Sequence, residues 1–206
     1  MKIEINLKII LVLILFLLLN NIDTYIIFLI FILIHELAHL FVGIMIGGKP
    51  RKLNLNPLGV SLEFYSYGKN KLIYKVLFYL AGPLVNLAIA IAFMYIEGLK
   101  GEYEKIIYTN LAICIFNLIP ILPLDGGKIL KEILRVILGI GPSNKFMILF
   151  SKCFLFAITF AYSIVIVKLK NVYLLVLIVY LWYLYYIEEK KYNIFKKASD
   201  TIKRVI

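Results

Sequence analysis

Long apolar runs separated by short polar stretches dominate the pattern of hydrophobic and polar residues along the chain. A transmembrane helix needs about 20 mostly apolar residues. The pattern predicts an all-α polytopic membrane protein with about six transmembrane helices, at residues 5–19, 24–46, 76–97, 106–124, 146–167 and 172–187. We expect residues 1–187 to form one membrane domain and residues 188–206 to form a short basic tail in the cytosol.

The first apolar run has a second interpretation, a cleaved secretory signal peptide, because Lys2 and Lys8 lie at its start. The sequence that follows it, Asn20-Asn21-Ile22-Asp23, lacks the small residues of a cleavage site. We therefore favour an uncleaved first helix.

The polar stretch at residues 47–75 differs from a plain loop. Leu53-Asn54-Leu55-Asn56 and Val60-Ser61-Leu62-Glu63-Phe64 alternate apolar and polar residues on either side of Pro57-Leu58-Gly59. Alternation with a period of two around turn residues is typical of a β-hairpin. We expect a short cytosolic hairpin that holds an extended substrate segment by main-chain pairing. The alternative is a basic loop that rests on anionic lipid head groups.

The composition of the chain supports the membrane interpretation. Hydrophobic residues make up 63% of the 206 residues and charged residues only 17%, whereas a soluble domain is about 45–50% apolar. This excess excludes an ordinary soluble enzyme, a disordered chain and a disulfide scaffold. Cys114 and Cys153 lie in different apolar runs, so no disulfide framework is predicted.

The basic residues are distributed unevenly between the two sides of the predicted membrane. A formal net charge of +11 would suggest a nucleic-acid partner for a soluble protein. If all six segments cross, however, one side holds most of the basic residues and the other has only Lys100, Lys105, Lys168 and Lys170. Cytosolic loops carry the excess of Lys and Arg. We therefore expect both termini in the cytosol, a lipid bilayer around the helices and no nucleic-acid partner.

The only two histidines of the chain lie in the sequence His35-Glu36-Leu37-Ala38-His39, inside the second segment. Residues four apart share a helix face, so both imidazoles can reach one ion. The pattern H-E-x-x-H on a helix is a zinc metalloprotease signature, in which the glutamate is the general base. The alternative is a hydrogen-bonded pair of core histidines. We favour the metal site because ionisable groups at membrane depth are costly and usually functional.

A third zinc ligand is needed, because catalytic zinc takes three protein ligands and one water molecule. The chain has no third histidine, so a carboxylate is expected, and Asp125 is the best placed. Pro120 and Pro123 precede it and prevent a regular helix. Broken backbone at membrane depth is tolerated where it lines a wet cavity or is buried in protein. The alternative is that Asp125 is a surface residue that caps the next helix.

Three motifs together resemble the site-2 protease family of intramembrane zinc metalloproteases. They are His35-Glu36-Leu37-Ala38-His39, Ala81-Gly82-Pro83-Leu84-Val85-Asn86 and the stretch 117–127, which reads Asn-Leu-Ile-Pro-Ile-Leu-Pro-Leu-Asp-Gly-Gly. Their order and spacing match the family over most of the chain. The resemblance implies one zinc ion per chain, bound by His35, His39 and Asp125, with Glu36 as the catalytic residue that activates water.

The resemblance also implies that two asparagines, Asn86 and Asn117, lie near the site. We predict that they contact the substrate or the oxyanion. Hydrogen bonding between helices is the alternative for both side chains.

Within this family, the chain most resembles the sporulation branch, which processes the precursor of the sigma-K transcription factor. The shared features are a short first segment, the loop Arg51–Phe64 with its sequence Asn56-Pro57-Leu58-Gly59, and the pair Glu188-Glu189 followed by basic residues. The implied substrate is a membrane-associated pro-sigma factor, and the implied partners are membrane regulatory or inhibitory proteins. The implied location is the mother-cell membrane around the forespore. Members of this branch often carry a cytosolic CBS domain, and another branch carries a PDZ domain; we expect neither here.

Two other classes of function compete with a protease, namely a metal transporter and a non-catalytic membrane scaffold. A transporter would need polar groups along the whole path across the bilayer, whereas here they cluster near one depth. A scaffold would not need Glu36 beside His35. The sequence therefore predicts a zinc metalloendopeptidase, either of the pro-sigma type or with a different membrane-protein substrate.

Overall fold

The computed structural model describes residues 2–5, 22–56, 59–66, 71–95, 103–169 and 172–205. The chain divides into two compact units, Met1–Leu118 and Ile119–Ile206. The first predicted transmembrane segment, 5–19, lies outside the described residues except for Ile5.

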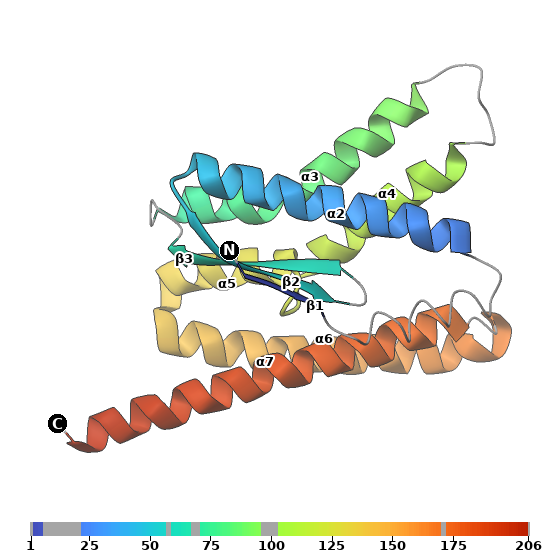
Figure 1. The fold of residues 1–206 in the computed structure, drawn as a ribbon. Coiled ribbons are helices and arrows are strands. Elements are labelled where there is room, and N and C mark those ends of the chain that lie inside the picture. Colours follow the sequence, from blue (N-terminus) through green and yellow to red (C-terminus); the bar gives the residue numbers. More distant parts are fainter. Residues whose placement is uncertain are drawn as a thin grey trace. The chain divides into compact units, whose positions relative to one another are not determined.

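Among its described residues, the first unit contains three helices, α2 (Ile22–Met45), α3 (Leu72–Met94) and α4 (Glu104–Leu118). The middle helix, α3, packs against both α2 and α4, and α2 also contacts α4 (Figure 1). These three helices hold most of the residues that the sequence predicts as functional.

The burial pattern of α2 is the reverse of that in a soluble protein. Its large apolar side chains Ile30, Leu33 and Phe41 are exposed, whereas His35 and His39 are buried. In a bilayer, lipid tails cover exposed apolar side chains, and polar groups face the interior of the helix bundle. The pattern therefore fits a helix surrounded by lipid on one side and by protein on the other.

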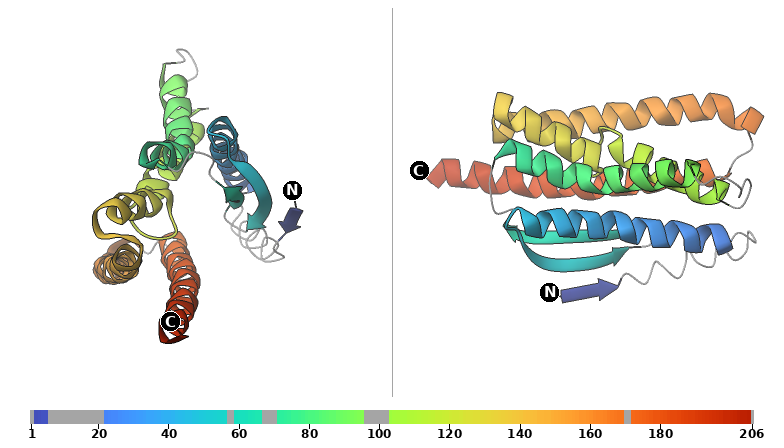
Figure 2. Two further views of the ribbon diagram at one scale, coloured as in Figure 1. Left: turned by 90° about the vertical axis from the view of Figure 1, so that its left-hand side faces the viewer. Right: turned by 90° about the horizontal axis from the view of Figure 1, so that it is seen from above.

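A small sheet of three strands lies beside α2 (Figure 2). The strands β2 (Lys49–Asn56) and β3 (Gly59–Ser66) pair antiparallel, with Leu53 opposite Leu62, and they occupy the residues for which the sequence predicts a hairpin. The strand β1 (Lys2–Ile5) was not predicted; it pairs parallel with β2, so the strand order is β1-β2-β3.

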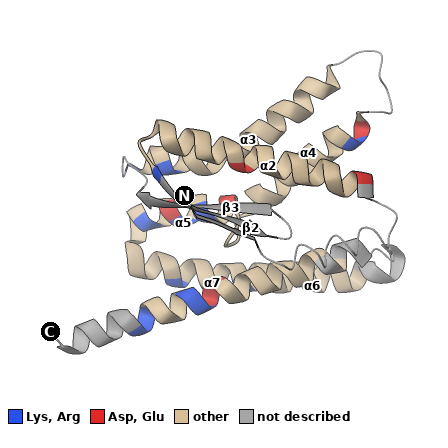
Figure 3. Ribbon diagram, in the orientation of Figure 1, with Lys and Arg blue, Asp and Glu red and all other residues tan. Residues whose placement is uncertain are grey.

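The second unit contains α5 (Asp125–Leu138), α6 (Ile140–Leu169) and α7 (Val172–Val205). Helix α6 packs against both α5 and α7. Basic residues gather on α5 and on the later part of α7 (Figure 3). On α5, burial and the nearby Arg135 lower the pKa of Lys131, which lies among these basic groups.

A broken stretch of backbone precedes α5, at the place where the two prolines predict a break. Helix α4 ends at Leu118 and α5 begins at Asp125. The Leu122 N–H donates to the Ser151 hydroxyl at 3.0 Å, which anchors the stretch to α6. A Cβ at Gly127 would lie only 2.2 Å from the Ile121 carbonyl oxygen, so a glycine is required where the first turn of α5 meets this stretch.

Three helices among the described residues are long and apolar enough to cross a bilayer, at Asp23–Met45, Leu72–Met94 and Ile140–Ile164. They coincide closely with the segments predicted at 24–46, 76–97 and 146–167. The segment predicted at 106–124 forms a helix of only 15 residues, because the backbone breaks after Leu118. The segment predicted at 172–187 is the first half of α7, which continues to Val205 through the residues predicted as a separate tail.

Candidate metal centre

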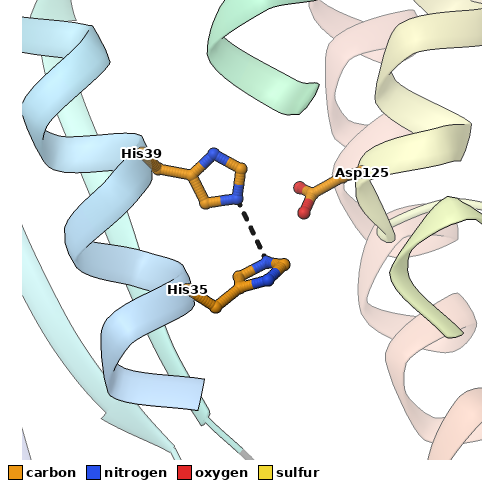
Figure 4. A group of neighbouring side chains, drawn as sticks. All are labelled: His35, His39 and Asp125. Carbon is orange, nitrogen blue, oxygen red and sulfur yellow. Dashed lines mark hydrogen bonds between the residues drawn. The ribbon is translucent and has the colours of Figure 1, made fainter. Parts of the chain in front are cut away.

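His35 and His39 lie one turn apart on α2 and point to the same place (Figure 4). Their side chains are 1% and 4% exposed, and their Nε2 atoms are 3.2 Å apart. Two nitrogen ligands bound to one tetrahedral zinc ion at about 2.0–2.1 Å lie about 3.3 Å apart. The spacing of the two imidazoles therefore fits a shared zinc ion.

The other nitrogen of each ring meets a hydrogen-bond acceptor. The His39 Nδ1 donates to the Phe78 carbonyl oxygen at 2.6 Å, and the His35 Nδ1 donates to Asn86 Oδ1 at 2.7 Å. A neutral imidazole with its proton on Nδ1 has a lone pair on Nε2. Neither Nε2 can then donate to the other, so the two lone pairs converge in the geometry that suits a bound cation.

Gly82, on α3, lies directly against both Nε2 atoms. A Cβ placed on this residue would be 2.5 Å from Nε2 of His35 and 2.5 Å from Nε2 of His39. Because both rings are held by their Nδ1 hydrogen bonds, neither can move aside without breaking one. The absence of a side chain at this position leaves room at the nitrogens for a ligand.

We expect Gly82→Ala to weaken zinc binding by about 10- to 100-fold, the range seen when groups that orient metal ligands are altered. The new methyl group would push the two imidazoles out of their shared geometry. Competition titration of the purified protein with a zinc chelator measures the effect. The matched control is Gly141→Ala, where an added Cβ meets nothing within 4 Å. Equal zinc affinity in both variants would contradict a metal at the two Nε2 atoms.

Glu36 follows His35 on α2, and it is the only acidic residue in the interior of that helix. Its side chain is half-buried, whereas the two histidines are buried. A carboxylate that is not fully enclosed can exchange protons with water, which the predicted role of general base requires.

Asp125 is the first residue of α5 and is 5% exposed. Figure 4 also draws this carboxylate, which belongs to the second compact unit, whereas the histidines belong to the first. Its Oδ1 accepts a hydrogen bond from the Lys128 ammonium at 3.0 Å. The alternative of a surface cap is not what the structure shows, because the carboxylate is buried and the N-cap position is Leu124.

The two predicted asparagines are engaged within the helix bundle. The Asn86 Nδ2 donates to Asn110 Oδ1 at 2.8 Å, and the Asn117 Nδ2 donates to the Ile113 carbonyl oxygen at 3.0 Å. These bonds do not test the predicted contact of the two asparagines with the substrate or the oxyanion, which stays a prediction.

Asn110, on α4, is fully buried, and sequence reasoning missed it. The signal that could have identified it is its distance of seven residues from Asn117, which places both asparagines on one face of the same helix.

Two family models match the chain, Peptidase M50B-like over residues 8–123 and Peptidase family M50 over residues 97–162. The chain is 28% identical over 130 residues to Stage IV sporulation protein FB of Bacillus subtilis, which covers 61% of this chain and 45% of that protein. It is 32% identical over 121 residues to a zinc metalloprotease of Methanocaldococcus jannaschii, covering 55% of this chain and 35% of that protein. The chain thus spans less than half the length of either relative.

The fold is also similar to that of a solved structure, the Site-2 Protease from Methanocaldococcus jannaschii. The TM-score is 0.72 at 24% identity, and the match covers 90% of this chain and 89% of that one. Together with the long apolar helices, these matches indicate an integral membrane protein with a membrane-protease fold.

Proposed function

Because the chain belongs to the Peptidase M50B-like family, whose model matches residues 8–123, we propose that it is an intramembrane zinc metalloendopeptidase. The observation that carries the proposal is the pair of buried imidazoles, whose Nε2 atoms lie 3.2 Å apart on an apolar helix. A pair of core histidines would not need both Nε2 lone pairs to converge. One relative is itself named a zinc metalloprotease.

We propose that His35 and His39 bind the zinc ion and that Asp125 supplies the third ligand. Two imidazole nitrogens and one carboxylate oxygen form a donor set typical of catalytic zinc. Asp125 is buried, so its carboxylate is costly unless it serves a cation, and the two cations at issue are zinc and the Lys128 ammonium at 3.0 Å. When bound, zinc polarises the scissile carbonyl and acidifies a water molecule to near-neutral pH.

Glu36 is the residue that moves protons in this proposal. Its carboxylate takes a proton from the attacking water and then delivers it to the leaving amine of the cleaved peptide bond. The position of Glu36, next to His35 but less buried than it, supports access to water.

A substrate must be extended before its backbone can react, because a helix hides its carbonyls in hydrogen bonds. We propose that β3, which is an edge strand among the described residues, holds a cytosolic pro-sequence by strand addition. The strand order supports this, because β2 lies between β1 and β3. The competing role is a basic loop on anionic head groups.

Prolines placed one at a time along β3 remove backbone N–H groups, and we expect them to reduce cleavage at unchanged zinc content. Unchanged cleavage throughout the series would exclude strand addition.

The likeness to Stage IV sporulation protein FB supports a role in sporulation, and from the resemblance to the sporulation branch we propose a membrane-associated pro-sigma factor as the substrate. On that proposal, all six segments cross the membrane, both termini face the cytosol and the protein acts in the mother-cell membrane around the forespore. Membrane regulatory proteins would be its further partners.

Co-expression with a membrane-associated pro-sigma factor tests this function directly. We expect a shortened sigma factor and one zinc ion per purified chain. If the protein binds one zinc ion per chain but cleaves only another membrane protein, it is still a zinc protease, and the pro-sigma substrate is excluded. Metal transport without cleavage of any substrate would favour the transporter instead.

A further inference from the structure

A line of buried hydrogen bonds runs from α4 through α3 to the first histidine on α2. The Asn110 Nδ2 donates to the Ile106 carbonyl oxygen at 2.9 Å, and the Asn86 Nδ2 donates to Asn110 Oδ1 at 2.8 Å. Asn86 Oδ1 in turn lies 2.7 Å from His35 Nδ1. Both asparagines are 0% exposed and His35 is 1% exposed, so water does not compete for these bonds.

The direction of every bond in this line follows from its first acceptor. A backbone carbonyl can only accept, so the Asn110 atom that faces Ile106 is the amide nitrogen. The oxygen of Asn110 must then face Asn86 and accept, which requires the amide nitrogen of Asn86 there. The oxygen of Asn86 is therefore left to face His35 and can only accept from Nδ1–H.

Rotating either amide by half a turn would set like groups against each other. A rotated Asn110 would place its oxygen against the Ile106 carbonyl oxygen and its nitrogen against the Asn86 nitrogen. The other acceptor near the Asn86 Nδ2, the Phe31 carbonyl oxygen, lies at 3.5 Å and holds the amide only weakly. The orientation of Asn86 thus depends mainly on Asn110.

We propose that Asn110 is a positioning residue that acts through Asn86 to keep the proton of His35 on Nδ1. Its effect is a permanent lone pair on His35 Nε2, the atom that faces His39 Nε2 at 3.2 Å. This inference rests on the proposed zinc function, because an Nε2 lone pair is what a metal ion requires. Asn110 lies on α4, and the hydrogen bonds of its side chain go to Asn86 and Ile106, so it acts on His35 only through Asn86.

His39 provides the internal comparison. Its Nδ1 donates directly to the Phe78 backbone carbonyl oxygen at 2.6 Å, which can accept only. No asparagine is needed to fix that ring. A general loosening of the helix packing would disturb both histidines, whereas the proposed role affects His35 alone.

The test uses the fact that the chain has two histidines. Protein labelled with ¹⁵N-histidine contains only two imidazoles, and their ¹⁵N shifts report which nitrogen carries the proton. Wild type, Asn110→Leu and Asn110→Asp are compared in detergent, both zinc-free and zinc-loaded. The two replacements have nearly the same shape as asparagine, but only the second retains an acceptor for Asn86.

In zinc-free wild type we expect both rings to carry the proton on Nδ1. In Asn110→Leu, His35 becomes a mixture of tautomers while His39 is unchanged, and zinc affinity falls by about 10- to 100-fold. In Asn110→Asp the new carboxyl, kept protonated by burial, donates to Ile106 and accepts from Asn86, so the wild-type shifts and affinity return. Should Asn110→Leu fold poorly, as a lowered melting temperature or aggregation in detergent would reveal, Asn86→Leu tests the same line one bond nearer to His35.

Two results would overturn the proposal, namely unchanged His35 shifts in both leucine variants, or equal changes at His35 and His39 in a well-folded variant. Failure of the proposed function is recognised separately. The wild-type protein could bind no zinc and still show a His35 tautomer that depends on Asn110. That result would exclude the zinc enzyme but support the positioning role of Asn110.

Discussion

Glu36→Gln is expected to bind zinc as tightly as wild type and to lose about 10²- to 10⁴-fold in cleavage rate, the usual contribution of a general acid–base group. Glutamine has nearly the same shape as glutamate, but its amide cannot accept a proton from water at neutral pH. Zinc content is unaffected because Glu36 is not a proposed ligand. Metal analysis of the purified protein, together with a cleavage assay on the same sample, separates the two effects.

The matched control for this variant is Asp23→Asn, which removes the other acidic residue of α2. Asp23 lies in the first turn of the helix and is exposed. We expect it to cleave at the wild-type rate with normal zinc. Near-normal cleavage by Glu36→Gln would show that another group takes the proton, and loss of zinc in that variant would mean that the carboxylate belongs to the metal site.

The features that depend on short-range pattern could be predicted from the sequence. His35 and His39 share a face because the helix period alone brings residues four apart together. Pro120 and Pro123 predicted the break between α4 and α5, because proline removes an N–H and clashes with the preceding turn.

The features that were missed depend on partners far along the chain. The strand β1 pairs Ile3 with Leu53, and four residues carry too little pattern to reveal such a pairing. Asn110 is a single asparagine in an apolar run, and its significance comes from Asn86, which lies 24 residues away on another helix. The direction of these hydrogen bonds depends on which groups face each other in the folded protein, and the local sequence does not reveal it.

Removing the carboxylate of Asp125 is the other change with a large expected effect. We expect Asp125→Asn to lower zinc affinity by more than the 10- to 100-fold typical of groups that only orient a ligand, and to abolish cleavage. The amide is nearly the same shape as the carboxylate, but it is neutral and a poor zinc ligand. The affinity is measured by chelator competition, and the stability of the zinc-free protein is measured beside it.

The competing explanation is that Asp125 serves the ion pair with Lys128, whose ammonium lies 3.0 Å from Oδ1. The Lys128 side chain is 40% exposed, so water screens the pair and its loss should cost little. Lys128→Met therefore serves as the control, and we expect it to retain zinc. Glu132→Gln is a second control, since it removes another buried carboxylate from α5, one that pairs with Arg135.

The three variants together discriminate between a ligand and a structural acid. If Asp125 binds zinc, Asp125→Asn alone loses the metal, while its zinc-free form melts close to the zinc-free wild type. If Asp125 only holds α5 in place, the zinc-free forms of Asp125→Asn and Lys128→Met are destabilised alike and both lose metal. Full zinc occupancy in Asp125→Asn would place the third ligand on another residue, and the broken backbone before α5 would then need a different explanation.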